Sequence, residues 1–138
     1  LPLTIKRLTI EKANFGVEFV EALIQQVKRF KNLKHLMISK TYVRDEKKGI
    51  WNTLVRLVGG KKQKAGVRLA KVLATNTTIK TLELRRTDLI GSENVEQWGN
   101  SLLNNNTLTN LVLDMVDADI KENLKTKTKD RTLTLEIA

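Results

Sequence analysis

The chain has 138 residues, a formal net charge of +10 and 41% hydrophobic residues, so it has the length and composition of one folded domain. It lacks the run of roughly 18 to 20 apolar residues that a transmembrane helix requires, and its first ten residues lack the apolar core of a signal peptide. Cysteine is absent, which excludes disulfides and thiolate metal ligands. We therefore expect an intracellular, cytoplasmic protein with no transmembrane segment, with an organelle as the alternative location.

The positive charge is concentrated in the middle of the chain. Residues 1–39 include 7 basic and 3 acidic side chains, residues 40–71 include 10 and 2, and residues 72–138 include 8 and 10. The middle segment alone has a charge of +8, so electrostatic attraction to an anionic partner is expected to be localised there.

A six-residue pattern with Leu or Ile at its first, fourth and sixth positions occurs four times. The segments are IKRLTI from Ile5, LKHLMI from Leu33, IKTLEL from Ile79 and LTNLVL from Leu108. Their starts differ by 28, 46 and 29 residues, so one period holds throughout if the second unit contains an insertion. Because the fourth and sixth positions of an extended chain lie on the same side, each segment predicts a strand buried on one face. The expected buried ladder is Leu8, Ile10, Leu36, Ile38, Leu82, Leu84, Leu111 and Leu113.

Apolar residues at helical spacing follow the strands. In the first unit they are Phe19, Val20, Leu23, Ile24 and Val27, and in the third unit they are Val95, Trp98, Leu102 and Leu103. A strand and a helix that each have one apolar face can bury both faces when successive units stack. The alternation therefore predicts an α/β fold with a parallel sheet on one side and helices on the other.

These units resemble leucine-rich repeats of the ribonuclease-inhibitor-like class. The segment GVRLAKVLATNTTIKTLEL, residues 66–84, is similar to that family's helix, Asn-containing turn and strand in order. The resemblance implies a leucine-rich-repeat solenoid, a short curved stack of strand-helix units with the parallel sheet on its concave side. It covers a single domain of residues 1–138, with about four repeats starting near 5, 33, 79 and 108, a helical insertion within 44–62 and a C-terminal cap at 119–138.

Two features of the turns extend or depart from the family pattern. Asn76, with Asn105 or Asn106, is expected near a helix end, where Asn tolerates the left-handed conformation. The ninth position of the repeat usually supplies a side chain that bonds the turning backbone, and it is occupied here by Ala13, Thr41, Thr87 and Val116. Only the two threonines offer a side-chain oxygen there. We therefore expect the ladder of side-chain bonds to the turning backbone to be incomplete in this chain.

The insertion is the least family-like part of the chain. Within DEKKGIWNTLVRLVGG an apolar helical stripe is formed by Ile50, Trp51, Leu54, Val55 and Val58. A second helix is expected after the two glycines, and either helix could occupy the regular place in the stack. The lysines and arginines of this region form a candidate basic patch of Lys47, Lys48, Lys61, Lys62, Lys64 and Arg68.

Enzymatic motifs are incomplete. His35 is the only histidine, so no second imidazole or thiolate can complete a zinc site. Asp114, Asp117 and Asp119 lack the spacing and the glycine of a calcium loop, and VGGKKQK lacks the order of a phosphate-binding loop. We expect a protein that is not an enzyme, with no catalytic residues, metal or cofactor.

The outward positions of the predicted strands form the candidate binding face. They are Arg7, Thr9, Glu11, His35, Met37, Ser39, Thr81, Glu83, Arg85, Asn110, Val112 and Asp114. Their mixture of both charges with apolar atoms suits a protein partner, whereas a polyanion favours uniform positive charge. The expected function is a non-catalytic protein-interaction module or scaffold subunit, as part of a larger chain or complex. The alternative is a basic accessory subunit of a nucleic-acid-containing or organellar complex, which contacts RNA, DNA or acidic protein through residues 40–71.

Overall fold

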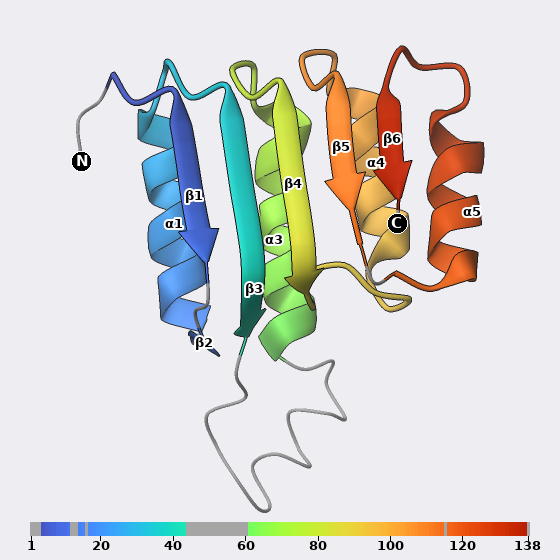
Figure 1. Cartoon of the computed structure of the whole chain (residues 1–138), viewed down its shortest axis with the longest axis horizontal. Coiled ribbons are helices and arrows are strands. Elements are labelled where there is room, and N and C mark those ends of the chain that lie inside the picture. The colour runs from blue at the N-terminus through green and yellow to red at the C-terminus, as the bar shows by residue number, and fades with distance from the viewer. Residues whose placement is uncertain (1–3, 12–13, 16, 44–60, 115, 138) are drawn as a thin grey trace, which may run out of the picture.

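The computed structural model describes residues 4–11, 14–15, 17–43, 61–114 and 116–137. Within these residues strands and helices alternate along the chain (Figure 1). The elements are β1 (Arg7–Glu11), β2 (Asn14–Phe15), α1 (Val17–Arg29), β3 (His35–Val43), α3 (Lys61–Thr75), β4 (Thr81–Thr87), α4 (Val95–Asn104), β5 (Asn110–Leu113), α5 (Ala118–Thr128) and β6 (Thr134–Ile137).

The strands form one parallel sheet in chain order, β1-β3-β4-β5-β6, and the short β2 pairs with the end of β3. The helices lie side by side behind this sheet (Figure 1). The opposite face of the sheet is left without a covering helix in the described part of the chain. The protein is therefore an α/β fold with two layers, in which one sheet face contacts the helices and the other is open.

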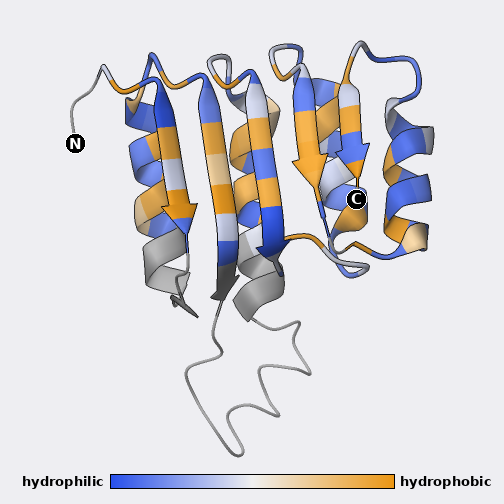
Figure 2. Ribbon diagram, viewed as in Figure 1, coloured by the Kyte–Doolittle hydropathy of each residue, from blue (hydrophilic) through white to orange (hydrophobic). Residues whose placement is uncertain are grey.

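The register of the sheet is the one that the sequence pattern predicts. Leu8, Leu36, Leu82, Leu111 and Leu135 occupy one continuous row across the strands. A second row contains Ile10, Ile38, Leu84, Leu113 and Ile137. The alternation of hydrophobic and hydrophilic residues is visible along β1 and β4 in Figure 2. The rows are buried in β3, β4 and β5, but Leu8 and Ile10 are only partly buried. They lie on an edge strand, which has a neighbouring strand on one side only.

Among the side chains that the structure describes, the helices bury most of those that their spacing predicts; the side chains of Phe19 and Val20 lie outside this set. Leu23, Ile24 and Val27 of α1 belong to the core, as do Trp98 and Leu102 of α4. Leu103 was expected on the same apolar side, but that prediction is wrong because its side chain is 45% exposed. Successive helical residues are rotated by about 100°, so burial of Leu102 directs its neighbour toward solvent.

Helix α3 occupies the regular place between β3 and β4, because it packs against α1 on one side and α4 on the other. The structure thus distinguishes between the two candidate helices of the insertion in favour of the one that starts at Lys61. The other candidate, with its apolar stripe from Ile50 to Val58, lies outside the described residues.

The segment at 119–138, which was expected to cap the stack, contributes a helix and a strand to the two layers. Ile120, Leu124 and Thr128 are the buried residues of α5, and they recur at every fourth position along one face. Strand β6 then pairs with β5 in the same parallel register as the preceding strands. The polar segment KENLKTKTK is therefore mostly the solvent-facing surface of a helix.

The asparagines of the turns act through their side chains. Among the described non-glycine residues, positive φ occurs only at Lys40 (52°) and Arg86 (51°), so the expected left-handed asparagines are wrong. Asn76 Oδ1 instead accepts the N–H groups of Thr78 at 3.0 Å and Ile79 at 2.8 Å. This replaces the backbone bonds that the turn itself cannot supply.

Asn105 repeats this arrangement and also joins two units. Its Oδ1 accepts the N–H groups of Thr107 and Leu108 at 2.9 and 2.7 Å, while its Nδ2 donates to Leu73 O and Asn76 O of the preceding turn. At the ninth repeat position, the buried hydroxyl of Thr87 has no hydrogen-bond partner, while Ala13 and the side chain of Thr41 lie outside the described part of the chain. The ladder of side-chain bonds thus begins three residues before the strand motif.

Candidate binding face

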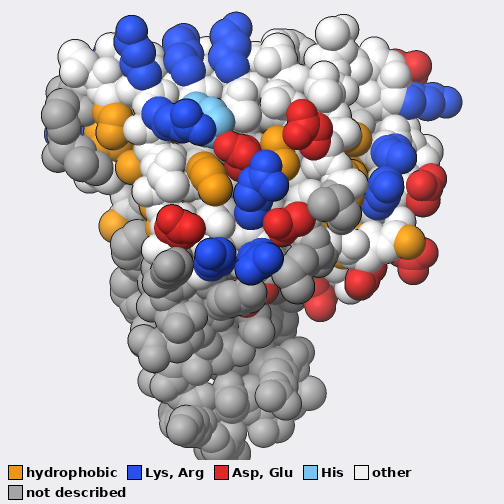
Figure 3. Space-filling view, viewed as in Figure 1, with side chains coloured by type: hydrophobic (Ala, Val, Ile, Leu, Met, Phe, Trp, Pro, Cys, Tyr) orange, Lys and Arg blue, Asp and Glu red, His pale blue; other side chains and the backbone are white. Residues whose placement is uncertain are grey.

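The structure assembles the predicted outward residues in three rows on the open face of the sheet. The rows are Arg7, His35, Thr81 and Asn110, then Thr9, Met37, Glu83 and Val112, then Glu11, Ser39 and Arg85. Adjacent members of a row are one strand apart, about 4.8 Å. Residues that are 28 to 46 positions apart in the chain therefore form one continuous surface, which Figure 3 views directly.

Exposure differs along this surface from the expectation that all of its residues face solvent. Arg7, Thr9 and Glu11 on β1 are exposed. Ser39 and Glu83 are only 5% and 9% exposed, and Val112 is likewise buried. The expectation is therefore wrong for these three inner residues, and for Glu83 the reason is that the longer side chains of Arg85 and His35 contact its carboxylate.

Glu83 is held by a cation on one side and an imidazole on the other. Arg85 donates to Oε1 from Nη2 at 2.9 Å and from Nε at 3.1 Å, and His35 Nε2 is hydrogen-bonded to Oε2. Burial would raise the pKa of Glu83, but hydrogen bonds from Arg85 and His35, with the charge interactions of the same two residues, outweigh it and lower the pKa below its usual value. The three residues form a fixed charge cluster at the centre of the open face.

The carboxyl-terminal edge of the sheet contains a second repeated feature. Lys40 and Arg86, the two left-handed residues, follow Ser39 and Arg85, which are paired in register. The backbone N–H of Arg86 donates to Asp114 Oδ1, and Lys40 Nζ lies 3.9 Å from Glu11 Oε1. Asp114 was predicted as a binding residue, but its carboxylate here also stabilises a turn.

The candidate basic patch is brought together only in part. Lys61, Lys62 and Lys64 belong to the first turns of α3, and Lys47 and Lys48 lie outside the described residues. Arg68 is exposed and donates to Glu21 Oε2 of α1 at 2.7 Å. Arg68 therefore connects two neighbouring helices through a surface ion pair, which contributes little to stability on its own.

A close helix contact was not anticipated from the sequence. A Cβ on Gly66 of α3 would lie 2.2 Å from Leu89 O and 2.3 Å from Asn94 Nδ2. That same carbonyl accepts the Asn94 amide at 3.0 Å and the Trp98 indole N–H at 3.1 Å. Gly66 thus lets α3 approach a buried polar network next to α4. The only sequence signal for this contact is an isolated Gly within a helical pattern.

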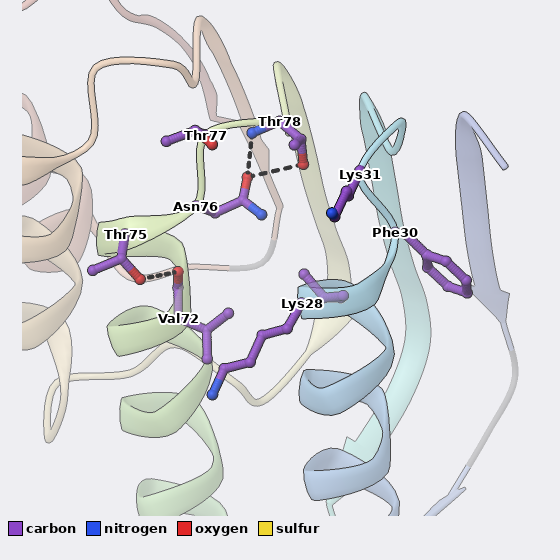
Figure 4. Close-up of a pocket in the computed structure, with 9 residues that line it drawn as sticks. Lys28, Phe30, Lys31, Val72, Thr75, Asn76, Thr77 and Thr78 are labelled. Atoms are coloured by element: carbon purple, nitrogen blue, oxygen red, sulfur yellow. Dashed lines mark hydrogen bonds between the residues drawn. The ribbon is translucent and has the colours of Figure 1, made fainter. Parts of the chain in front are cut away.

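A shallow pocket of about 420 Å³ separates the carboxyl-terminal ends of α1 and α3 (Figure 4). The equivalent seam between α3 and α4 is bridged by Asn105. Phe30 occupies the corresponding position in the earlier unit, and in the described part of the chain Asn76 makes no bond to α1. The pocket is lined by Val27, Lys28, Phe30, Lys31, Val72, Thr75, Asn76, Thr77 and Thr78.

Comparison with known proteins does not assign a family, since no protein-family model matches the chain and no curated protein matches it. Among the described residues, no group of three or more His, Asp or Glu side chains could hold a metal ion. Of the described helices, none combines the length and the hydropathy required to cross a bilayer. The site must therefore be interpreted from its own geometry.

Proposed function

We propose that this chain is a leucine-rich-repeat protein of the ribonuclease-inhibitor-like class and that its open sheet face binds a protein partner without catalysis. The chain-order parallel sheet, the repeated register of leucines and the helices on one side support this class. The observation that carries the function is the open face itself. It holds a fixed charge cluster of His35, Glu83 and Arg85 beside a partly buried Met37.

The chemistry of this face suits a protein surface. Arg85 is held in place by Glu83, but 38% of its side chain is accessible, so further N–H groups can donate to a partner. A fixed arginine loses less conformational entropy on binding than a free one. Arginine and methionine are also enriched at protein interfaces. The centre of the face thus offers an ordered donor next to apolar atoms, and the exposed polar side chains of β1 lie toward one edge of the face.

The proposal is tested with a double variant, Met37→Ala with Arg85→Ala, and a matched double variant on the helical side, Lys71→Ala with Gln97→Ala. Each is used with the original chain to retain proteins from a nuclease-treated extract, and the retained proteins are quantified. We expect one set of proteins to be lost with the open-face variant and kept with the helical-side variant, because only the first removes atoms from the binding surface.

Melting temperatures of the two variants check that each is folded. If the same proteins are retained by all three chains, the open face is not the binding surface. The original chain is also used with an untreated portion of the same extract. If proteins are retained from that portion and lost after nuclease treatment, the alternative role as a subunit of a nucleic-acid-containing complex is favoured instead.

A further inference from the structure

The amino-terminal edge of the sheet gathers basic side chains from three separate segments. Residues 4–9, 26–36 and 74–82 contain seven lysines and arginines and no aspartate or glutamate. The start of a strand and the end of the preceding helix lie at the same edge of this parallel arrangement, so the three segments converge there (Figure 1). We call the seven exposed residues the basic rim: Lys6, Arg7, Lys28, Arg29, Lys31, Lys34 and Lys80.

Three of these lysines form a row across adjacent strands. Lys34 N donates to Lys6 O and Lys80 N donates to Lys34 O, each at 2.8 Å, so the residues occupy equivalent places one strand apart, about 4.8 Å. Basic side chains stand along this edge in Figure 3. In the described part of the chain, none of the three forms an ion pair. The row ends where Thr109 follows in the next strand.

The composition of the rim distinguishes it from the open face. All seven rim residues are positively charged, and five of them are lysine. Lysine is depleted at protein interfaces but commonly contacts phosphate groups. Phe30 is buried and the imidazole of His35 is hydrogen-bonded to Glu83, so the rim segments offer no exposed Phe, Tyr or Trp ring on which an unpaired base could stack. A phosphate backbone fits these properties better than an acidic protein, and a duplex fits better than a single strand.

We propose that the basic rim binds the phosphate backbone of duplex nucleic acid without reading its sequence. Lys6, Lys34 and Lys80 supply the contacts along the edge. Lys31 belongs to the basic rim and also lines the pocket between α1 and α3, together with Asn76 and Thr77. The amide of Asn76 and the hydroxyl of Thr77 are side-chain groups that commonly contact phosphate oxygens. The three lysines lie outside the open face, which shares only Arg7 with the basic rim, and the proposed contacts include no residue of 40–71.

The test uses a fluorescein-labelled 20-base-pair duplex of arbitrary sequence, whose binding is followed by anisotropy between 50 and 200 mM salt. The triple variant Lys6→Gln, Lys34→Gln and Lys80→Gln should reduce the log–log salt slope by roughly two to three, since each phosphate contact contributes about 0.9. Over this fourfold salt range, the original chain should therefore lose roughly 40-fold more affinity than the variant.

Two control triples remove the same charge elsewhere. Lys71→Gln, Lys125→Gln and Lys129→Gln change exposed lysines on the helical side, and Lys61→Gln, Lys62→Gln and Lys64→Gln change the start of α3. Both should keep a slope within about one unit of the original, because they remove long-range attraction rather than a contact.

An unchanged slope in the rim triple overturns the inference, and so does an equal reduction in either control. Tighter binding of poly-glutamate than of the duplex, lost in the rim triple, would overturn it in favour of an acidic protein partner. Because all three rim lysines are exposed, circular dichroism should show an unchanged fold. The single variant Lys34→Gln should reduce the slope by about one and provides a milder test if the triple variant is unstable.

Discussion

Truncation of Leu82 should destabilise the protein far more than truncation of Leu8, although both occupy the same row of the sheet. Leu82 is 1% exposed and is paired in register with Leu36 on one side and Leu111 on the other. Only about 10 Å³ of space lies beside it in the seam behind β3 and β4, so its neighbours have little freedom to fill a larger cavity. Leu82→Ala should therefore cost about 3 kcal/mol, within the usual 2 to 5 for buried leucine.

Leu8 lies on the edge strand and is only partly buried, so Leu8→Ala should cost about 1 kcal/mol, in proportion to the smaller apolar area removed from water. Urea unfolding followed by circular dichroism and tryptophan fluorescence measures both values, provided that the two probes give coincident transitions. Equal losses for the two variants, or a loss under 1 kcal/mol for Leu82→Ala, would refute the assigned register and the continuous core behind it.

Three further predictions follow from individual contacts. Gly66→Ala should lower the free energy of unfolding by about 2 to 3 kcal/mol because its Cβ would meet the backbone carbonyl of Leu89. Gly99→Ala is the control, since its Cβ meets only the flexible Lys127 side chain, and it should be neutral or stabilising by up to about 1 kcal/mol. Similar shifts in melting temperature for both variants would contradict this. Removal of the five side-chain hydrogen bonds of Asn105 by Asn105→Ala should cost about 2 kcal/mol in urea unfolding, and a loss of a few tenths would show that the turn does not need them. The folded-state pKa of Glu83 is lowered, so its carboxylate stabilises the fold above the unfolded pKa near 4.5, and this contribution disappears as pH falls through the folded value. Glu83→Gln should therefore make the free energy of unfolding less dependent on pH between pH 6 and about pH 3. The same pH dependence in the variant and the original chain would contradict that.

The strands were predictable because the spacing of their leucines is set by simple geometry. Side chains alternate across a strand, and a four-fold recurrence of the same spacing fixes both the buried side and the register between neighbours. Leu36, Leu82 and Leu111 consequently align as the pattern predicts. The same reasoning placed His35, Glu83 and Arg85 on one face, since it depends only on the backbone period.

The side-chain contacts could not be obtained in the same way. Nothing in the strand pattern shows that Arg85 and His35 cover Glu83 and leave it 9% exposed, because that depends on rotamers across three strands. The role of the asparagines in the turns was also predicted wrongly. Asn105 was expected to supply backbone conformation, but it supplies a carbonyl and an amide to two turns that are about one repeat apart in the chain. Contacts between units depend on register, and the local sequence around one unit does not contain that information.

Charge shows the same dependence on register. When basic residues are counted along the chain, residues 40–71 stand out with a charge of +8, and Lys6, Lys34 and Lys80 are unremarkable members of other segments. When the residues are counted by position within the repeated unit, the second position of the first three strand motifs is lysine each time. A parallel sheet converts that recurrence into a row of charges at one edge. The open face, by contrast, contains both signs close together, since Glu83 and Arg85 lie two positions apart on β4 and form an ion pair. One sheet therefore presents two surfaces with different electrostatic character, and each of them suits a different class of partner.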